Sequence, residues 1–207
     1  MKKVILFLAL VISIVSANRI SAQSIEELYE SGRKAFYEDK FDEANDYFMK
    51  ILVLDSDNFD NCYFKGLVYE INFDYENAIK QYSSALEFND GCSECFKARG
   101  RVYEKMENYD QAISDYKNAI KYNDTDSDSF FKLASIYQDK NQYGFAVEYY
   151  SDYINMNPEN DIAYYNRGLC YVELAQNDKA AVDFEKAIQI DGIWEKTLRP
   201  VIESIGY

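Results

Sequence analysis

The sequence repeats itself with a period of 34 residues, and this period limits the folds open to the chain more than any other feature. A small residue recurs at the eighth position of five consecutive segments that start at Ile25, without any insertion between them. These small residues are Gly32, Gly66, Gly100, Ala134 and Gly168, and in the same frame Ala44, Ala78, Ala112, Ala146 and Ala180 precede Phe48, Tyr82, Tyr116, Tyr150 and Phe184. A period of this length is typical of stacked helix pairs.

Each recurring position has a packing role in such a stack. Glycine or alanine on the first helix, and alanine on the second, let the two helices of a pair approach closely. The aromatic residues then fill the space between helices. A further aromatic recurs between the two helices in four segments and is absent only at Asn177 in the fifth; it is Phe41, Tyr75, Tyr109 and Tyr143. We therefore interpret these residues as packing positions and predict an all-α fold.

The pattern resembles the tetratricopeptide repeat family over Ile25–Trp194. The resemblance implies a right-handed superhelical solenoid of helix-turn-helix units, which bound 25–58, 59–92, 93–126, 127–160 and 161–194. In the third unit we expect helices over about 94–106 and 108–122. Residues 195–207 follow as a C-terminal capping helix, in which Pro200 predicts either a kink or a late start.

The first 22 residues have the features of a signal peptide. Lys2 and Lys3 precede an apolar run from Val4 to Val15, which is short for a bilayer span, and a small-residue site ends at Ala22. We expect cleavage after Ala22, export to the periplasm or outside the cell, and no integral membrane span after cleavage. An uncleaved anchor is the alternative.

Composition excludes several classes of function. The net charge of −14 argues against binding to nucleic acid, which needs a basic face. The sequence has no histidine, and it lacks a glycine-rich phosphate loop and a nucleophile elbow. We therefore predict that the chain is not an enzyme and takes no cofactor or metal.

Two short motifs have a structural and a functional interpretation. Cys92-Ser93-Glu94-Cys95 lies at a predicted helix start and predicts a disulfide, either between these two cysteines or from one of them to Cys62. Unpaired apolar side chains and a redox or metal-binding role are the alternatives. Asp124-Thr125-Asp126-Ser127-Asp128 resembles the opening of a calcium loop, but Ser129 stands where the loop needs Gly and Ser135 where it needs Glu. We interpret it as a solvated turn whose acids cap the next helix.

The positions that the repeat leaves free indicate a binding surface. In the family that the chain resembles, the first helix of each unit lines the concave surface, and residues four apart share one face of a helix. We predict a peptide-binding groove with three cationic residues in its middle, Lys97, Arg101 and Lys105. The rest of the predicted groove is Tyr29, Arg33, Phe36, Tyr37, Tyr63, Phe64, Leu67, Phe131, Lys132, Tyr165 and Asn166.

The sequence thus predicts an exported scaffold that binds a protein or peptide, with at least one partner carboxylate opposite the three cations. The competing interpretation of those cations is an ordinary charged helix surface neutralised by nearby glutamates. A structural, self-associating component of a cell-envelope assembly is the alternative function. Binding of a small molecule or glycan to the groove aromatics is a third.

Overall fold

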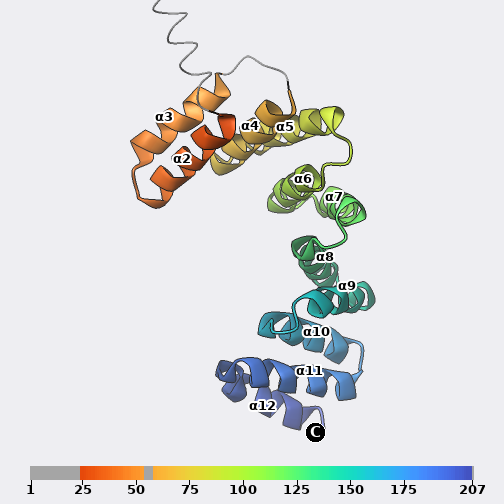
Figure 1. The fold of residues 1–207 in the computed structure, drawn as a ribbon. Coiled ribbons are helices and arrows are strands. Elements are labelled where there is room, and N and C mark those ends of the chain that lie inside the picture. The colour runs from red at the N-terminus through yellow and green to blue at the C-terminus, as the bar shows by residue number, and fades with distance from the viewer. Residues whose placement is uncertain (1–23, 54–57, 207) are drawn as a thin grey trace, which may run out of the picture. The chain divides into compact units, whose positions relative to one another are not determined.

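The computed structural model describes residues 24–53 and 58–206, and in these residues the fold is all-α, with eleven α-helices, one 3-10 helix and no strand (Figure 1). The predicted signal peptide lies outside the described residues. The helices are α2 (Ile25–Tyr37), α3 (Phe41–Leu52), α4 (Phe59–Ile71), α5 (Tyr75–Phe88), α6 (Ser93–Lys105), α7 (Tyr109–Tyr122), α8 (Ser127–Asp139), α9 (Tyr143–Met156), α10 (Asp161–Glu173), α11 (Asn177–Ile190), η1 (Gly192–Trp194) and α12 (Glu195–Ser204).

The helices form antiparallel pairs in two compact units, which we describe separately. Unit 1 ends at Asp90 and contains α2–α5, and unit 2 begins at Gly91 and contains α6–α12. Both predicted helices of the third segment are present with ends within one residue of those expected. The all-α fold class, built from repeated helix pairs, is confirmed.

The turn inside every pair has the same backbone geometry. One residue adopts a left-handed conformation with φ between 56° and 59°, and the next amide donates a hydrogen bond of 2.8–2.9 Å back into the end of the first helix, as in a Schellman motif. The left-handed residues are Asp39, Phe73, Glu107, Asn141 and Ala175. Because none is glycine, each side chain has to tolerate this conformation.

Phe73 is the least suited of the five to its position, and this gives a first prediction. Asn tolerates the left-handed region and a bulky aromatic does not, so Phe73→Asn should raise the free energy of unfolding by about 1 kcal/mol. Asn141→Phe, the reciprocal change in unit 2, should lower it by a similar amount. Urea unfolding followed by circular dichroism measures both, and unchanged midpoints would contradict the argument.

The glycines of the repeat lie where the two helices of a pair meet. A Cβ atom added to Gly66 would lie 2.5 Å from the Tyr82 ring, and one added to Gly168 would lie 2.5 Å from the Phe184 ring. At Gly100 the nearest atom would be 3.2 Å away, so that approach is looser. The predicted role of these small residues in close helix contact is confirmed.

The recurring aromatic of the second helix is matched to its partner on the first helix. Where it is tyrosine its hydroxyl donates to an acceptor twelve residues earlier, as in Tyr82 to Glu70 at 3.0 Å, Tyr116 to Glu104 at 2.7 Å and Tyr150 to Gln138 at 2.8 Å. In the first and fifth pairs the aromatic is Phe48 or Phe184, and the corresponding partner position holds the apolar Phe36 or Val172. This interior contact is therefore polar in the three middle pairs and apolar in the first and fifth, and in neither version is a buried acceptor left without a donor.

Helix α12 closes the end of unit 2. Its Leu198 and Ile202 are buried against α11, in a cluster with Ala180, Phe184 and Ala187. Pro200 lies inside the helix, which begins at Glu195 rather than late. The outer face carries charged residues, as expected of a capping element.

Candidate functional site

A cavity of about 360 Å³ lies in unit 2, and it is lined mainly by the first helices of three consecutive pairs. Four residues of the predicted groove line it, namely Lys97, Arg101, Phe131 and Lys132. The other lining residues are Tyr116, Asp128, Tyr153, Asn160 and Ile162. Helices α6, α8 and α10 thus bring together side chains that are 65 residues apart in the sequence, from Lys97 to Ile162.

The apolar wall of this cavity is built around Phe131. Its ring meets the Tyr150 ring edge-on at 5.6 Å and the Tyr153 ring at 5.0 Å between centroids. The Tyr153 hydroxyl accepts a hydrogen bond of 3.0 Å from Asn160 Nδ2. Ile162 is 48% exposed at the rim. The wall is therefore held in place by packing on one side and is open to a ligand at its rim.

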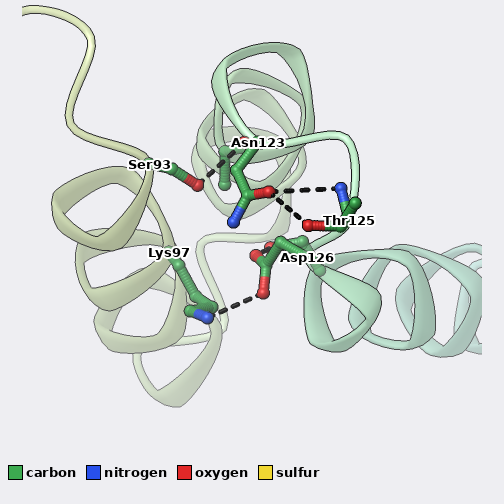
Figure 2. Close-up of polar contacts among 7 residues, drawn as sticks. Ser93, Lys97, Asn123, Thr125 and Asp126 are labelled. Atoms are coloured by element: carbon green, nitrogen blue, oxygen red, sulfur yellow. Dashed lines mark hydrogen bonds and ion pairs between the residues drawn. The ribbon is translucent and has the colours of Figure 1, made fainter.

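Lys97 is paired with a buried carboxylate (Figure 2). Its Nζ lies 2.7 Å from Asp126 Oδ1, and the Asp126 side chain is only 5% exposed. Ser129 Oγ donates to the other carboxylate oxygen. Burial by itself would lower the pKa of Lys97, but the hydrogen bond and the negative charge of Asp126 outweigh it and raise the pKa. Lys97 is therefore a fixed, protonated donor at neutral pH.

The turn that carries Asp126 is fixed by its own hydrogen bonds. Asn123 Oδ1 accepts from the Thr125 hydroxyl at 2.7 Å and from the Thr125 amide at 3.2 Å, and Ser93 on α6 donates to the carbonyl of Ala119 at 2.9 Å (Figure 2). Our prediction of a solvated turn is wrong for Asp126, because this carboxylate is buried by its contacts with Lys97 and Ser129. Among the described residues, no group of three or more Cys, Asp or Glu side chains is placed to hold a metal ion.

The second lysine of the cavity is also paired. Lys132 Nζ lies 2.9 Å from Glu104 Oε1, whose other oxygen accepts from the Tyr116 hydroxyl. Lys105 does not line the cavity and is exposed. The predicted set of three cations in mid-groove is thus corrected: Lys97 and Arg101 line the cavity, and Lys97 is neutralised by Asp126, which lies 29 residues away in the sequence.

The remaining predicted groove residues of unit 2 lie outside this cavity. Tyr165 stacks on the Trp194 ring at 4.5 Å, and Trp194 Nε1 donates to Asp161 at 2.6 Å. Tyr165 therefore contacts the η1 segment that leads into the capping helix α12. Asn166 is half-buried, and its side chain is within hydrogen-bonding reach of the Tyr150 hydroxyl.

In unit 1 the predicted groove residues differ in exposure. Tyr29 is 9% exposed and packs against Phe48 and Phe64, and burial raises its pKa to about 12, so our placement of Tyr29 on the groove surface is wrong. The physical reason is that its position faces the neighbouring pair. Tyr63, Phe64 and Leu67 are half-buried, while Arg33, Phe36 and Tyr37 are exposed.

Sequence reasoning missed five of the cavity residues. Tyr116 and Tyr153 come from second helices, which we did not assign to the groove. Asn160 caps the start of α10 by accepting a hydrogen bond from the Ala163 amide at 2.8 Å, so its capping role is visible in the sequence but its place in the cavity is not. Asp128 and Ile162 both occupy the second position of their segments. The apolar Ile162, which is exposed in the structure, is the one residue at this position whose type could have indicated a binding surface.

The structure joins Cys92 and Cys95 by a disulfide at the start of α6. Cys92 is the N-cap residue, and its sulfur accepts a hydrogen bond from the Cys95 amide. Cys62 and Cys170 are buried elsewhere, at 5% and 0% exposure, and take no part in this bridge. Of the two predicted pairings, the structure therefore has the one within the motif.

Alkylation tests this arrangement. Burial raises the pKa of the Cys170 thiol to about 12, which keeps it protonated and unreactive at pH 8 in the folded state. We expect iodoacetamide in denaturant without reductant to modify Cys62 and Cys170 only, and all four cysteines after reduction. Intact mass spectrometry counts the adducts. Four adducts without reductant would contradict the bridge.

A second cavity, of about 800 Å³, lies between α11 and α12. Arg199, one of its lining residues, is ion-paired with both Glu185 and Glu195. Val182, which also lines this cavity, is 68% exposed. None of the described helices is long and apolar enough to cross a membrane.

The fold and the site define a class, that of helical-repeat proteins built from 34-residue helix pairs. Sequence models of the tetratricopeptide repeat match residues 59–92, 93–126, 127–160 and 162–192. These segments make up more than half of the sequence, and the chain belongs to the tetratricopeptide repeat family. The first pair, α2 and α3, lies outside the matched segments but has the same turn geometry.

Solved structures share this fold. A crystal structure of MamA is 23% identical, with a TM-score of 0.68 over 83% of this chain and 94% of that one. A structure of MamA from Desulfovibrio magneticus RS-1 is 16% identical, with a TM-score of 0.68 over 81% and 94%. YrrB, described as a TPR protein with an unusual peptide-binding site, is 20% identical, with a TM-score of 0.67 over 91% and 96%. No curated protein matches the chain.

Proposed function

We propose that this protein is a scaffold that binds a segment of a partner protein in the cavity of unit 2. The observation that carries the proposal is the cavity itself, in which the apolar wall around Phe131 lies beside the ion-paired Lys97 and Lys132. Its volume lies within the range of about 300–1,000 Å³ that is usual for ligand sites. It is large enough for one bulky side chain and the backbone beside it.

The chemistry of the cavity suggests how a segment binds. An apolar or aromatic side chain of the partner packs against Phe131, Tyr153 and Ile162. A carboxylate of the partner approaches Lys97, whose ammonium group has three donors, so it can bind this carboxylate without losing Asp126. Because the charges are already paired, we expect the apolar contact to supply most of the affinity and the cations to orient the segment.

A substitution at the exposed rim tests this proposal without disturbing the core. Ile162→Glu places a charge at the mouth of the cavity, and we expect at least a tenfold loss of partner recovery in copurification from the native cell envelope. Ile193→Glu is the matched control, since Ile193 is 72% exposed in the same unit and does not line the cavity. Equal recovery with wild type and Ile162→Glu would exclude the cavity as the binding site.

The resemblance to YrrB supports a peptide as the ligand, because that protein is described as having a peptide-binding site. We further propose that the chain is exported and that the partner is an envelope or secreted protein. The support is the N-terminal sequence of Lys2, Lys3 and an apolar run. N-terminal sequencing of the protein from its native source should begin at Gln23, and a first residue of Met1 or Lys2 would contradict export with cleavage.

Self-association is the second candidate function, favoured by the cavity between α11 and α12. A helix of a second copy could cover Ala181, Val182 and Ile202, the apolar residues that line that cavity. Light scattering over a range of protein concentrations distinguishes the two functions. A monomer at all concentrations favours the partner-binding scaffold, and a mass that doubles or grows favours assembly.

A further inference from the structure

Unit 1 carries an exposed aromatic surface at the turns inside its two helix pairs. We call it the turn edge and define it as Phe36, Tyr37, Phe41, Ile71 and Phe73. Tyr37 is 77% exposed and Phe73 75% exposed. The Phe36 ring meets the Tyr37 ring at 6.2 Å and the Phe41 ring at 5.6 Å. Ile71, two residues before Phe73, packs against the cluster that contains Ala35 of the first pair and Val68 of its own helix, and α4 packs against both α2 and α3.

The repeat provides its own control for this surface. The three pairs of unit 2 have the same turns, yet they place charged or small residues at the positions of Tyr37 and Phe73. The thirteenth residue of those segments is Lys105, Asp139 or Glu173, and the fifteenth is Glu107, Asn141 or Ala175. The fold therefore does not require aromatic residues at these positions.

Phe73 also adopts an unfavourable backbone conformation without gaining burial. Its φ of 59° disfavours a bulky side chain, and three quarters of that side chain remain exposed. Its ring meets the Tyr75 ring edge-on at 6.3 Å between centroids, and this contact leaves most of the Phe73 side chain exposed. Strained backbone conformations are concentrated at functional surfaces. A partner that covers Phe73 accounts for both its conformation and its exposure.

The charges around the turn edge indicate the chemistry of that partner. Residues 34–43 and 72–76 contribute six carboxylates against two ammonium groups, Lys34 and Lys40, and Lys40 is already paired with Glu38 at 2.6 Å. The carboxylates are Glu38, Asp39, Asp42, Glu43, Asp74 and Glu76. An acidic rim around aromatic side chains complements apolar residues flanked by Lys or Arg, and it repels a second copy of this acidic chain.

We infer that the turn edge is a second docking surface, which binds a protein segment with large apolar side chains flanked by Lys or Arg. This surface is separate from the cavity of unit 2, and the inference does not depend on the proposed function. Charge complementarity orients the partner, and Tyr37 and Phe73 provide the apolar contact.

Fluorescence anisotropy with three labelled peptides tests the inference. The first is a twelve-residue peptide of alternating Phe and Lys, the second has Glu for Lys, and the third has Ser for Phe. The purified chain should bind the first at least tenfold more tightly than either of the others. Tyr37→Asn/Phe73→Asn should weaken this binding at least tenfold, while the charge-neutral control Phe145→Asn/Ile193→Asn should change it less than twofold.

Folding does not obscure this result, because Phe73→Asn alone should raise the urea midpoint while it weakens peptide binding. Equal losses in the two double variants would show general attraction to an acidic protein and would overturn the inference. Loss of binding in Ile162→Glu would assign the peptide to the cavity of unit 2 instead. Binding to phosphatidylglycerol vesicles that requires Tyr37 and Phe73, or a dimer that the same substitutions abolish, would equally overturn it in favour of a membrane or a second copy.

Discussion

Replacing Arg167 by Leu should lower the free energy of unfolding by about 3–5 kcal/mol. Arg167 Nε and one of its terminal nitrogens donate to the two oxygens of Asp183 at 2.8 and 2.7 Å, and the two side chains are 16% and 4% exposed. Burial by itself would lower the pKa of Arg167, but the bonds to Asp183 outweigh it and the pKa is raised. Without the guanidinium, Asp183 remains as a buried carboxylate without its main partner. Trp194, the only tryptophan, stacks in the same unit and reports its unfolding by fluorescence.

Another segment of the repeat indicates a second substitution that should restore the stability lost in Arg167→Leu. In the fourth segment the same two positions hold Leu133 and Tyr149. Arg167→Leu/Asp183→Tyr should therefore recover most of the loss, since replacing both partners of a buried ion pair by apolar groups is often nearly neutral. Lys140, whose partner Asp110 is 88% exposed, is the surface control, and Lys140→Leu should cost less than about 1 kcal/mol. A double variant as unstable as Arg167→Leu would contradict this account of the pair.

Gly168→Ala has the next largest expected effect, a loss of about 1–3 kcal/mol from overpacking. The added Cβ would lie 2.5 Å from the Phe184 ring, which is fully buried, so one of the two helices or the ring would have to shift. This loss should exceed the gain of up to about 1 kcal/mol that alanine brings to a helix. Trp194 fluorescence during urea unfolding measures the difference.

Two other glycines serve as controls for this prediction. An added Cβ on Gly144 meets nothing within 4 Å, so Gly144→Ala should leave stability unchanged or slightly raised. Gly100→Ala should be intermediate, because its nearest contact would be 3.2 Å. If Gly168→Ala proved as stable as Gly144→Ala, the close approach of α10 and α11 would not be the reason for glycine at that position.

The fold could be predicted from the sequence because one period specifies every pair. Small residues such as Gly66 and Gly168 mark where helices cross, and the tyrosines and phenylalanines that follow mark what fills the crossing. These contacts lie within a single segment, at separations of 12 or 16 residues, so the sequence displays both partners in a fixed order. Even the exchange of Glu70 and Tyr82 for Val172 and Phe184 is visible as paired variation between segments.

The candidate site could be predicted only in part, because its contacts lie between segments. Lys97, one of the predicted groove residues, lines the cavity, but its partner Asp126 is on a turn that the sequence predicts to be solvated. Tyr29 has the same position in its segment as Lys97, yet it is buried against Phe64 of the next pair. A position in the repeat fixes the direction of a side chain, while its exposure depends on the size of the side chains in the neighbouring pair.

Site-specific photocrosslinking tests the central claim, that the cavity of unit 2 binds a partner, most directly. A benzophenone amino acid replaces Ile162 at the cavity rim or, as the control, the exposed Ile193, and the protein is irradiated in cells of its native source. We predict one discrete crosslinked product from position 162 and none from position 193. No product from position 162, or the same products from both positions, would contradict the claim.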